Sequence, residues 1–101
     1  MAITIGNYNF ESPFNSTNDL RSQSGVYAIL GRNAHTESWN VVDIGESGDV
    51  KTRVSNHDRA ECWKQRRYQQ LTAAAHYRDA QSRIKVEQEL RAQYNPPCGE
   101  R

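Results

Sequence analysis

The chain has 101 residues, of which 36% are hydrophobic and 25% are charged, and its formal net charge is +1 at pH 7. This length fits one domain with a single modest core, and the composition is typical of a globular chain rather than a disordered one. No apolar run is long enough to cross a bilayer, and the N-terminal MAITIGNYNF lacks the features of a signal peptide. We therefore expect a globular protein with no membrane partner.

The first predicted elements form a hairpin that follows a lead-in segment. Residues 1–24 are rich in Asn, Ser and Thr, with one short strand at AITIGNYNF, and residues 25–101 are predicted to be a single domain. The β-rich runs GVYAIL (25–30) and WNVVDIG (39–45) are joined by a polar stretch that is typical of a hairpin loop.

Four further elements follow the hairpin. Asp49 is a candidate N-cap for a short helix, and residues 59–71 have helical composition. TAAAHYR (72–78) is predicted to be a third strand, and a last helix starts at Ser82 and stops at NPP, because proline cannot continue a helix. This order predicts an α/β (α+β) fold, with a small three-stranded antiparallel sheet flanked by helices.

The two cysteines are Cys62 and Cys98. They are too few for a disulfide scaffold, and they do not form a metal-binding pair. We expect ordinary thiols and a cytoplasmic protein, because the cytoplasm keeps thiols reduced.

The short helix carries charged residues on the stripe that its valines mark as the core face. Val50 and Val54 share this stripe with Arg53 and His57, since positions three, four and seven apart lie on one face. We expect the valines to pack on the sheet while Arg53 and His57 line a cleft.

The last helix repeats this pattern. Glu87 lies inside its apolar arc, whereas Glu89 lies outside it, and a buried carboxylate is costly unless it is paired, hydrogen-bonded or bound to a cation. One interpretation is a Glu87–Arg53 salt bridge that only satisfies two buried charges. The other is a site, because Arg53, His57 and Glu87 supply the phosphate clamp, the proton-transfer group and the ligand for a hard cation that phosphodiester hydrolysis needs.

Basic residues are concentrated between residues 51 and 67. Six basic residues face two acidic ones there, a local excess of four positive charges. Such a cluster indicates a phosphate-binding face, and a solvated helical surface is the alternative. Besides Arg53, the candidate nucleic-acid-binding residues are Lys51, Arg59, Lys64, Arg66 and Arg67.

Two short motifs stand in the predicted hairpin, GVY at 25–27 and DIG at 43–45. Three side chains follow at set spacings: Arg53 eight positions after Gly45, His57 one turn later, and Glu87 nine residues before Pro96. This ordered set resembles the GIY-YIG nuclease superfamily, and the resemblance spans about residues 24 to 99.

The resemblance implies a GIY-YIG nuclease-like fold and a divalent-metal-dependent endonuclease that hydrolyses DNA phosphodiester bonds. Carried over to this chain, Glu87 would bind Mg²⁺ (or Mn²⁺), Arg53 would clamp the scissile phosphate, and Tyr27 would orient or deprotonate the attacking water. His57 would serve as a proton shuttle, since its ordinary pKa of about 6.5 suits that task.

Two positions depart from the family pattern. Asp43 stands where the second motif usually has tyrosine, and Gly99 stands where the family has asparagine. Asp43 either supplies a second carboxylate to the metal or marks a lost tyrosine role. The second hypothesis favours a catalytically silent nucleic-acid-binding or protein-interaction module on the same scaffold. RNA as the substrate, a homodimer and a partner protein also stay open.

Overall fold

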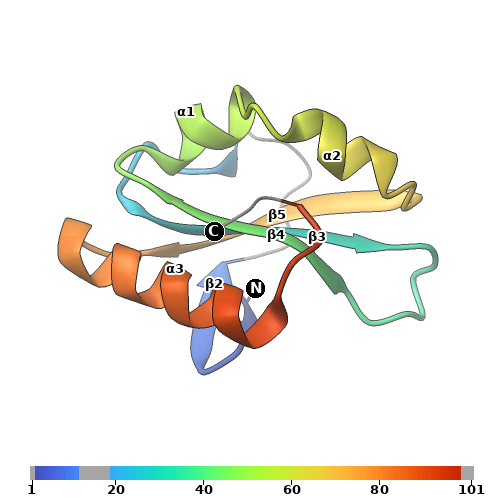
Figure 1. Cartoon of the computed structure of the whole chain (residues 1–101), viewed down its shortest axis with the longest axis horizontal. Helices are drawn as coiled ribbons and strands as arrows, with labels where there is room; N and C mark the ends of the chain where they lie inside the picture. The colour runs from blue at the N-terminus through green and yellow to red at the C-terminus, as the bar shows by residue number, and fades with distance from the viewer. Residues whose placement is uncertain (1, 12–18, 99–101) are drawn as a thin grey trace.

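The computed structural model describes residues 2–11 and 19–98 and has an α+β fold. In this part of the chain five strands form one curled antiparallel sheet in the order β1-β2-β5-β3-β4. The strands are β1 (Ala2–Ile5), β2 (Tyr8–Glu11), β3 (Gly25–Arg32), β4 (Asn40–Ser47) and β5 (Gln70–Tyr77), and the helices are α1 (Val50–Ser55), α2 (Ala60–Gln65) and α3 (Ala80–Tyr94). Helices α1 and α2 cover one face of the sheet, and α3 covers the other (Figure 1). No helix among the described residues is long and apolar enough to span a membrane.

Strand β3 is the centre of the predicted part of the sheet. It pairs with β4 on one side, where Tyr27 is opposite Gly45, and with β5 on the other, where Tyr27 is opposite Ala75. The predicted hairpin and the predicted strand over TAAAHYR are therefore confirmed. Because both sides of β3 are paired, every residue of the strand except Arg32 is buried, and Tyr27 is held between two neighbouring strands.

The predicted number of three strands is wrong. Strands β1 and β2 form a hairpin within the segment that the sequence assigned to a lead-in, and β2 joins the sheet beside β5. The turn between them contains Gly6 at a φ of +61°, a conformation that favours glycine. The Gly-Asn pair divides the run AITIGNYNF, predicted as one strand, into a hairpin.

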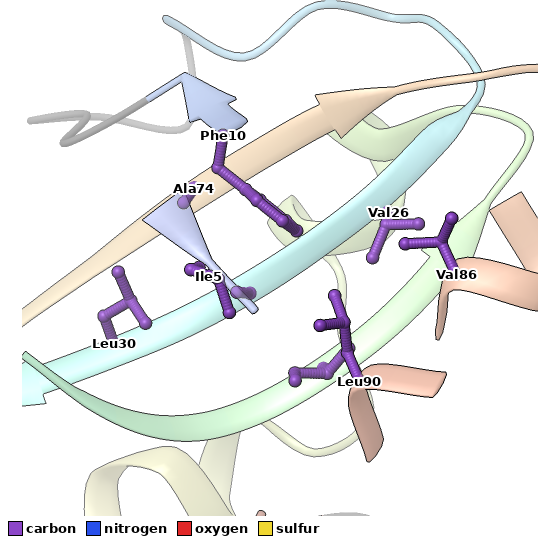
Figure 2. Close-up of a cluster of buried hydrophobic side chains, with 9 residues drawn as sticks. Ile5, Phe10, Val26, Leu30, Ala74, Val86 and Leu90 are labelled. Carbon is purple, nitrogen blue, oxygen red and sulfur yellow. The ribbon is translucent and has the colours of Figure 1, made fainter. Parts of the chain in front are cut away.

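The β1–β2 hairpin completes the core on the α3 face of the sheet. Ile5 and Phe10 from the hairpin point into the same space as Val86 and Leu90 from α3 (Figure 2). The opposite face has a second core beneath α1 and α2. Its buried members are Leu20, Tyr27, Ile29, Val42, Val50, Val54, Trp63, Ala75 and Cys98.

The helix starts follow side-chain caps. Asp49 is the N-cap of α1, as predicted, because its Oδ1 accepts a hydrogen bond from the Thr52 amide at 3.1 Å. Helix α3 begins before the predicted Ser82, since Asp79 is its cap and accepts from the Ser82 amide at 2.9 Å. Aspartate and serine are both favoured at N-caps, and here the side chain of Asp79, three residues before Ser82, takes this position.

The helix ends follow backbone conformation. Helix α2 is shorter than the predicted helix over 59–71, because the chain turns at Arg67, whose φ is +60°, and continues as β5. Helix α3 ends at Tyr94, where Asn95 adopts the left-handed conformation ahead of Pro96, so the predicted stop at NPP is confirmed.

Cys62 and Cys98 form a disulfide with a Cα–Cα distance of 5.9 Å. The expectation of ordinary thiols is therefore wrong. Both cysteines reach the same place although 36 residues separate them, since the chain returns from α3 to β4 and the Cys98 amide donates to the Val42 carbonyl at 3.1 Å. Disulfides are typical of oxidising compartments. The expectation of a cytoplasmic location depended on reduced thiols, so the cysteines no longer support it.

Candidate active site

A polar pocket of about 190 Å³ brings together side chains from both faces of the sheet. It is lined by Tyr27, Gly45, Glu46, Arg53, Arg59, Glu87 and Arg91. Three of the five predicted catalytic residues are among them: Tyr27 from β3, Arg53 from α1 and Glu87 from α3. They meet because β4 is an edge strand, so residues above and below the sheet can approach one another around it.

Gly45 leaves room for the side chain of Tyr27. The two residues are opposite each other in the β3–β4 ladder, and a Cβ at residue 45 would collide with the Tyr27 hydroxyl. The glycine of the DIG motif therefore lets a buried tyrosine bring its hydroxyl to the pocket.

The Tyr27 hydroxyl is hydrogen-bonded to Nε2 of His57. Burial, with help from the charges of Arg53 and Arg59, lowers the pKa of His57 from 6.5 to about 4. The imidazole is therefore neutral at pH 7, with one nitrogen that donates and one that accepts. This low pKa differs from the near-neutral value that made His57 a candidate proton shuttle.

The two contacts of Nδ1 decide which nitrogen of His57 carries the proton. The backbone N–H of Arg59 lies 3.0 Å from Nδ1, and a backbone N–H can only donate. An Asp58 carboxylate oxygen is also near, at 3.3 Å, but this contact would be an ion pair only for a protonated ring. In the neutral ring we therefore assign the proton to Nε2, which donates it to the Tyr27 oxygen.

The phenol of Tyr27 then has its own proton available for a group in the pocket. Burial is the largest cause of a raised pKa for Tyr27, so the side chain is a neutral phenol at pH 7. In this state Tyr27 is a hydrogen-bond donor rather than a base.

Arg53 and the valines of α1 lie as the helical pattern predicted, but His57 lies beyond the end of α1 and is not among the residues that line the pocket. Val50 and Val54 are buried against the sheet, while Arg53 lines the pocket. Its Nη2 is 3.1 Å from Asp58, and the two side chains are 39% and 73% exposed. Ion pairs this exposed are weak, so the Arg53 guanidinium can turn from Asp58 to a bound anion at little cost.

Glu87 is only 4% exposed, so the predicted inward orientation is confirmed. Val86 and Leu90 of the same helix are also buried. The apolar arc expected from helical spacing runs from Val86 through Leu90 and Tyr94 to Ile84, but Ile84 and Tyr94 are 44% and 38% exposed. The buried arc of α3 is thus narrower than the sequence indicated, and Glu87 and Arg91 occupy part of it.

Asp43 faces inward and is fully buried. Arg59 donates to both of its oxygens, from Nε at 2.8 Å and from Nη2 at 3.1 Å. The indole N–H of Trp63 donates to the same carboxylate at 2.7 Å, and Nη1 of Arg91 donates at 3.1 Å. Both oxygens are therefore occupied by protein donors, and a metal at Asp43 would have to displace them.

The structure separates the predicted nucleic-acid-binding residues into two groups. Arg59 lines the pocket, immediately before α2. Lys64, Arg66 and Arg67 are exposed, and Lys51 is half-buried. Only Arg59 therefore belongs to the same site as Tyr27, Arg53 and Glu87. Gly99, the second departure from the family pattern, lies outside the described residues.

Sequence reasoning missed the roles of Trp63 and Arg91 as partners of Asp43. Arg91 had a signal, because it follows Glu87 by four residues and so shares its helical face. For Trp63, nothing in the local sequence indicates that its indole N–H meets a carboxylate.

The carboxylates that line the pocket are Glu46 and Glu87. Glu46 pairs with Arg83 at 2.7 Å, and Glu87, which is 4% exposed, is the candidate ligand that the resemblance implies. Within the described residues no three His, Cys, Asp or Glu side chains gather as a metal-binding group. Mg²⁺ is commonly held by one or two carboxylates together with substrate phosphates, so a buried carboxylate in a pocket whose arginines can bind phosphate fits that ion.

In comparisons with known proteins, no family model, no curated protein and no solved structure matches the chain.

Proposed function

We propose that this protein is a metal-dependent endonuclease of the GIY-YIG type that hydrolyses phosphodiester bonds in DNA. The observation that carries the proposal is the pocket itself, where Tyr27, Arg53 and Glu87 meet from three separate elements. These are the residue types, at the spacings, that the resemblance assigns to phosphate cleavage.

Each side chain has a role that follows from its surroundings. Arg53 binds the non-bridging oxygens of the phosphate, because its pair with Asp58 is exposed and weak. The Tyr27 hydroxyl donates a hydrogen bond that orients the phosphate or the attacking water, while His57 holds the phenol in place through Nε2. Glu87 would hold the Mg²⁺ or Mn²⁺, which when bound stabilises the negative charge that develops on the phosphate.

The test is a cleavage assay on duplex, branched and single-stranded DNA, and on RNA, with and without Mg²⁺ or Mn²⁺. We expect metal-dependent cleavage of at least one DNA substrate. Glu87→Gln should abolish it while DNA binding stays within about twofold, because the carboxylate acts through the metal. Arg53→Gln should lower the cleavage rate by about a hundredfold or more, because it removes a donor aimed at developing charge.

The Glu87→Gln preparation also controls for a contaminating nuclease, since a contaminant would cleave in both samples. Cleavage that survives this substitution, or a folded parent protein that cleaves none of the substrates with either metal, would refute the proposal.

Asp43 supports a second candidate function, a nucleic-acid-binding module without catalysis. The second motif tyrosine is absent, and the carboxylate in its place is held by protein donors. In that case binding of the same substrates would be measurable, no metal would produce cleavage, and Glu87→Gln would change nothing.

A further inference from the structure

We propose that Asp43 is a positioning residue that holds Arg59 in the pocket as a second phosphate-binding guanidinium beside Arg53. This inference deepens the proposed function, on which it rests for the phosphodiester ligand. Asp43, which stands in place of the second motif tyrosine, then serves anion binding rather than metal binding.

The pair between Asp43 and Arg59 fixes the orientation of the guanidinium. Nε and Nη2 of Arg59 meet the two different oxygens of the carboxylate, at 2.8 and 3.1 Å. Such a side-on, two-bond contact sets the plane of the guanidinium as well as its position. Asp43 itself lies on β4 in the sheet, so Arg59 is anchored to a strand that is hydrogen-bonded to β3.

Arg59 keeps hydrogen-bond donors for a ligand after this pairing. A guanidinium has five N–H donors, and Asp43 takes two of them, which leaves three on Nη1 and Nη2. The side chain is 28% exposed and lines the pocket together with Arg53. Two guanidinium groups from different segments of the chain therefore border one small space.

Arg91 has a different role, although it contacts the same carboxylate. Its Nη1 donates to Asp43 and to the Ile44 carbonyl, and its Nη2 donates to the Cys98 carbonyl at 3.2 Å. These contacts tie Arg91 to the protein and help to hold Asp43 in place. Trp63 adds an uncharged donor to Oδ2 of Asp43.

The charges of this group favour an anion. Two guanidinium groups, Arg59 and Arg91, share the single carboxylate of Asp43, so the three side chains keep a net charge of about +1. In the same pocket Arg53 offsets the charge of Glu87, so this excess is available to a phosphodiester, which has one negative charge for each phosphate. A buried, hydrogen-bonded group of this kind attracts an anion more strongly than exposed lysines do.

The experiment measures DNA binding in the absence of divalent metal, by the fluorescence anisotropy of a short labelled duplex titrated with the full chain. Arg59→Gln should weaken binding about tenfold, the size expected for charge-assisted hydrogen bonds. The slope of log Kd against log salt should fall by about one, because one phosphate contact is lost. Inorganic phosphate should compete less well for this variant than for the parent.

Asp43→Asn should reproduce the loss seen for Arg59→Gln, and the double variant should bind no more weakly than either single variant. This non-additivity is expected because Asp43 acts through Arg59, and a merely structural role would not produce it. Arg59→Lys is the second probe, because lysine keeps the charge but cannot form the two-bond pair. It should also bind several-fold more weakly than the parent.

Arg32→Gln is the matched control, because Arg32 lies at the far end of β3 and contacts Gln70 and Trp39. Its binding should match that of the parent. Circular dichroism and the melting temperature verify that every variant is folded; if Asp43→Asn does not fold, Arg59→Gln and Arg59→Lys decide. Parent-like binding by folded Arg59→Gln, or additive losses in the double variant, would overturn the inference. Because no cleavage is measured, failure of the nuclease proposal would be seen separately.

Discussion

The imidazole of His57 loses proton affinity when the chain folds. Its pKa falls from 6.5 to about 4, because burial and the neighbouring Arg53 and Arg59 disfavour the cation. Between these pH values the unfolded chain binds a proton that the folded chain does not, so stability is complete above the ordinary pKa and falls as the pH drops toward 4. Between neutral pH and pH 4, the free energy of unfolding should fall by about 3 kcal/mol less in His57→Gln than in the parent. Urea unfolding across this pH range measures the difference.

The groups that face His57 are Tyr27, Trp63, Asp43, Asp58 and the two arginines. Carboxyl groups that titrate independently of His57 contribute equally to the parent and the variant, so their effect on stability drops out of the difference. His35→Gln, at an exposed histidine between β3 and β4, is the matched control. Equal acid sensitivity in the parent and in His57→Gln would contradict the prediction.

At the scale of elements, the disulfide joins α2 to the segment that follows α3. Cys62 lies beside Trp63, and the carbonyl of Cys98 accepts from Arg91, so the bond links two partners of Asp43. Because the bond closes a loop across 36 residues, replacing both cysteines with serine should lower the free energy of unfolding by about 2–4 kcal/mol. Guanidinium unfolding of the oxidised parent and of the double variant measures the difference.

A reducing agent supplies the control for this experiment. The reduced parent should unfold at the same midpoint as the double serine variant, and the variant itself should not respond to the agent. A parent midpoint that is unchanged by reduction would show that the bond contributes nothing to stability.

For the whole molecule, the β1–β2 hairpin is part of the core rather than an appendage. Phe10 is fully buried among residues of β3, β5 and α3, as Figure 2 shows. Phe10→Ala should therefore lower the free energy of unfolding by about 3–5 kcal/mol, measured by urea denaturation. Leu71→Ala, at a residue of β5 that is 41% exposed, should change it by about 0.5 kcal/mol or less. If the two variants lose similar amounts of unfolding free energy, the packing of Phe10 in the core does not stabilise the protein.

Local patterns predicted much of the fold. The β-rich runs of β3 and β4, the cap at Asp49 and the stop before Pro96 each depend on a few neighbouring residues, and each is confirmed. The hairpin of β1 and β2 and the ends of α2 and α3 were predicted less well. There, weak local signals compete, and pairing with β5 or packing on the core selects among them.

The candidate site divides in the same way. Helical spacing placed Arg53 and Glu87 on the inner faces of their helices, as the structure has them. The inward direction of Asp43 depends on the register shift between β3 and β4 next to it. The partners of Asp43 could not be predicted, because they lie far from it in the sequence. Arg59 is the residue before α2, Trp63 lies within α2, and Arg91 lies in the last turn of α3.

The sequence by itself determined that Val50, Val54 and Glu87 turn away from solvent, because the period of the helix acts within a few residues. Only the tertiary structure decided what those side chains meet. It joined Cys62 to Cys98 and surrounded Asp43 with two guanidinium groups and an indole. Such contacts depend on how β4, α2 and α3 pack together, and no short stretch of the sequence encodes that packing.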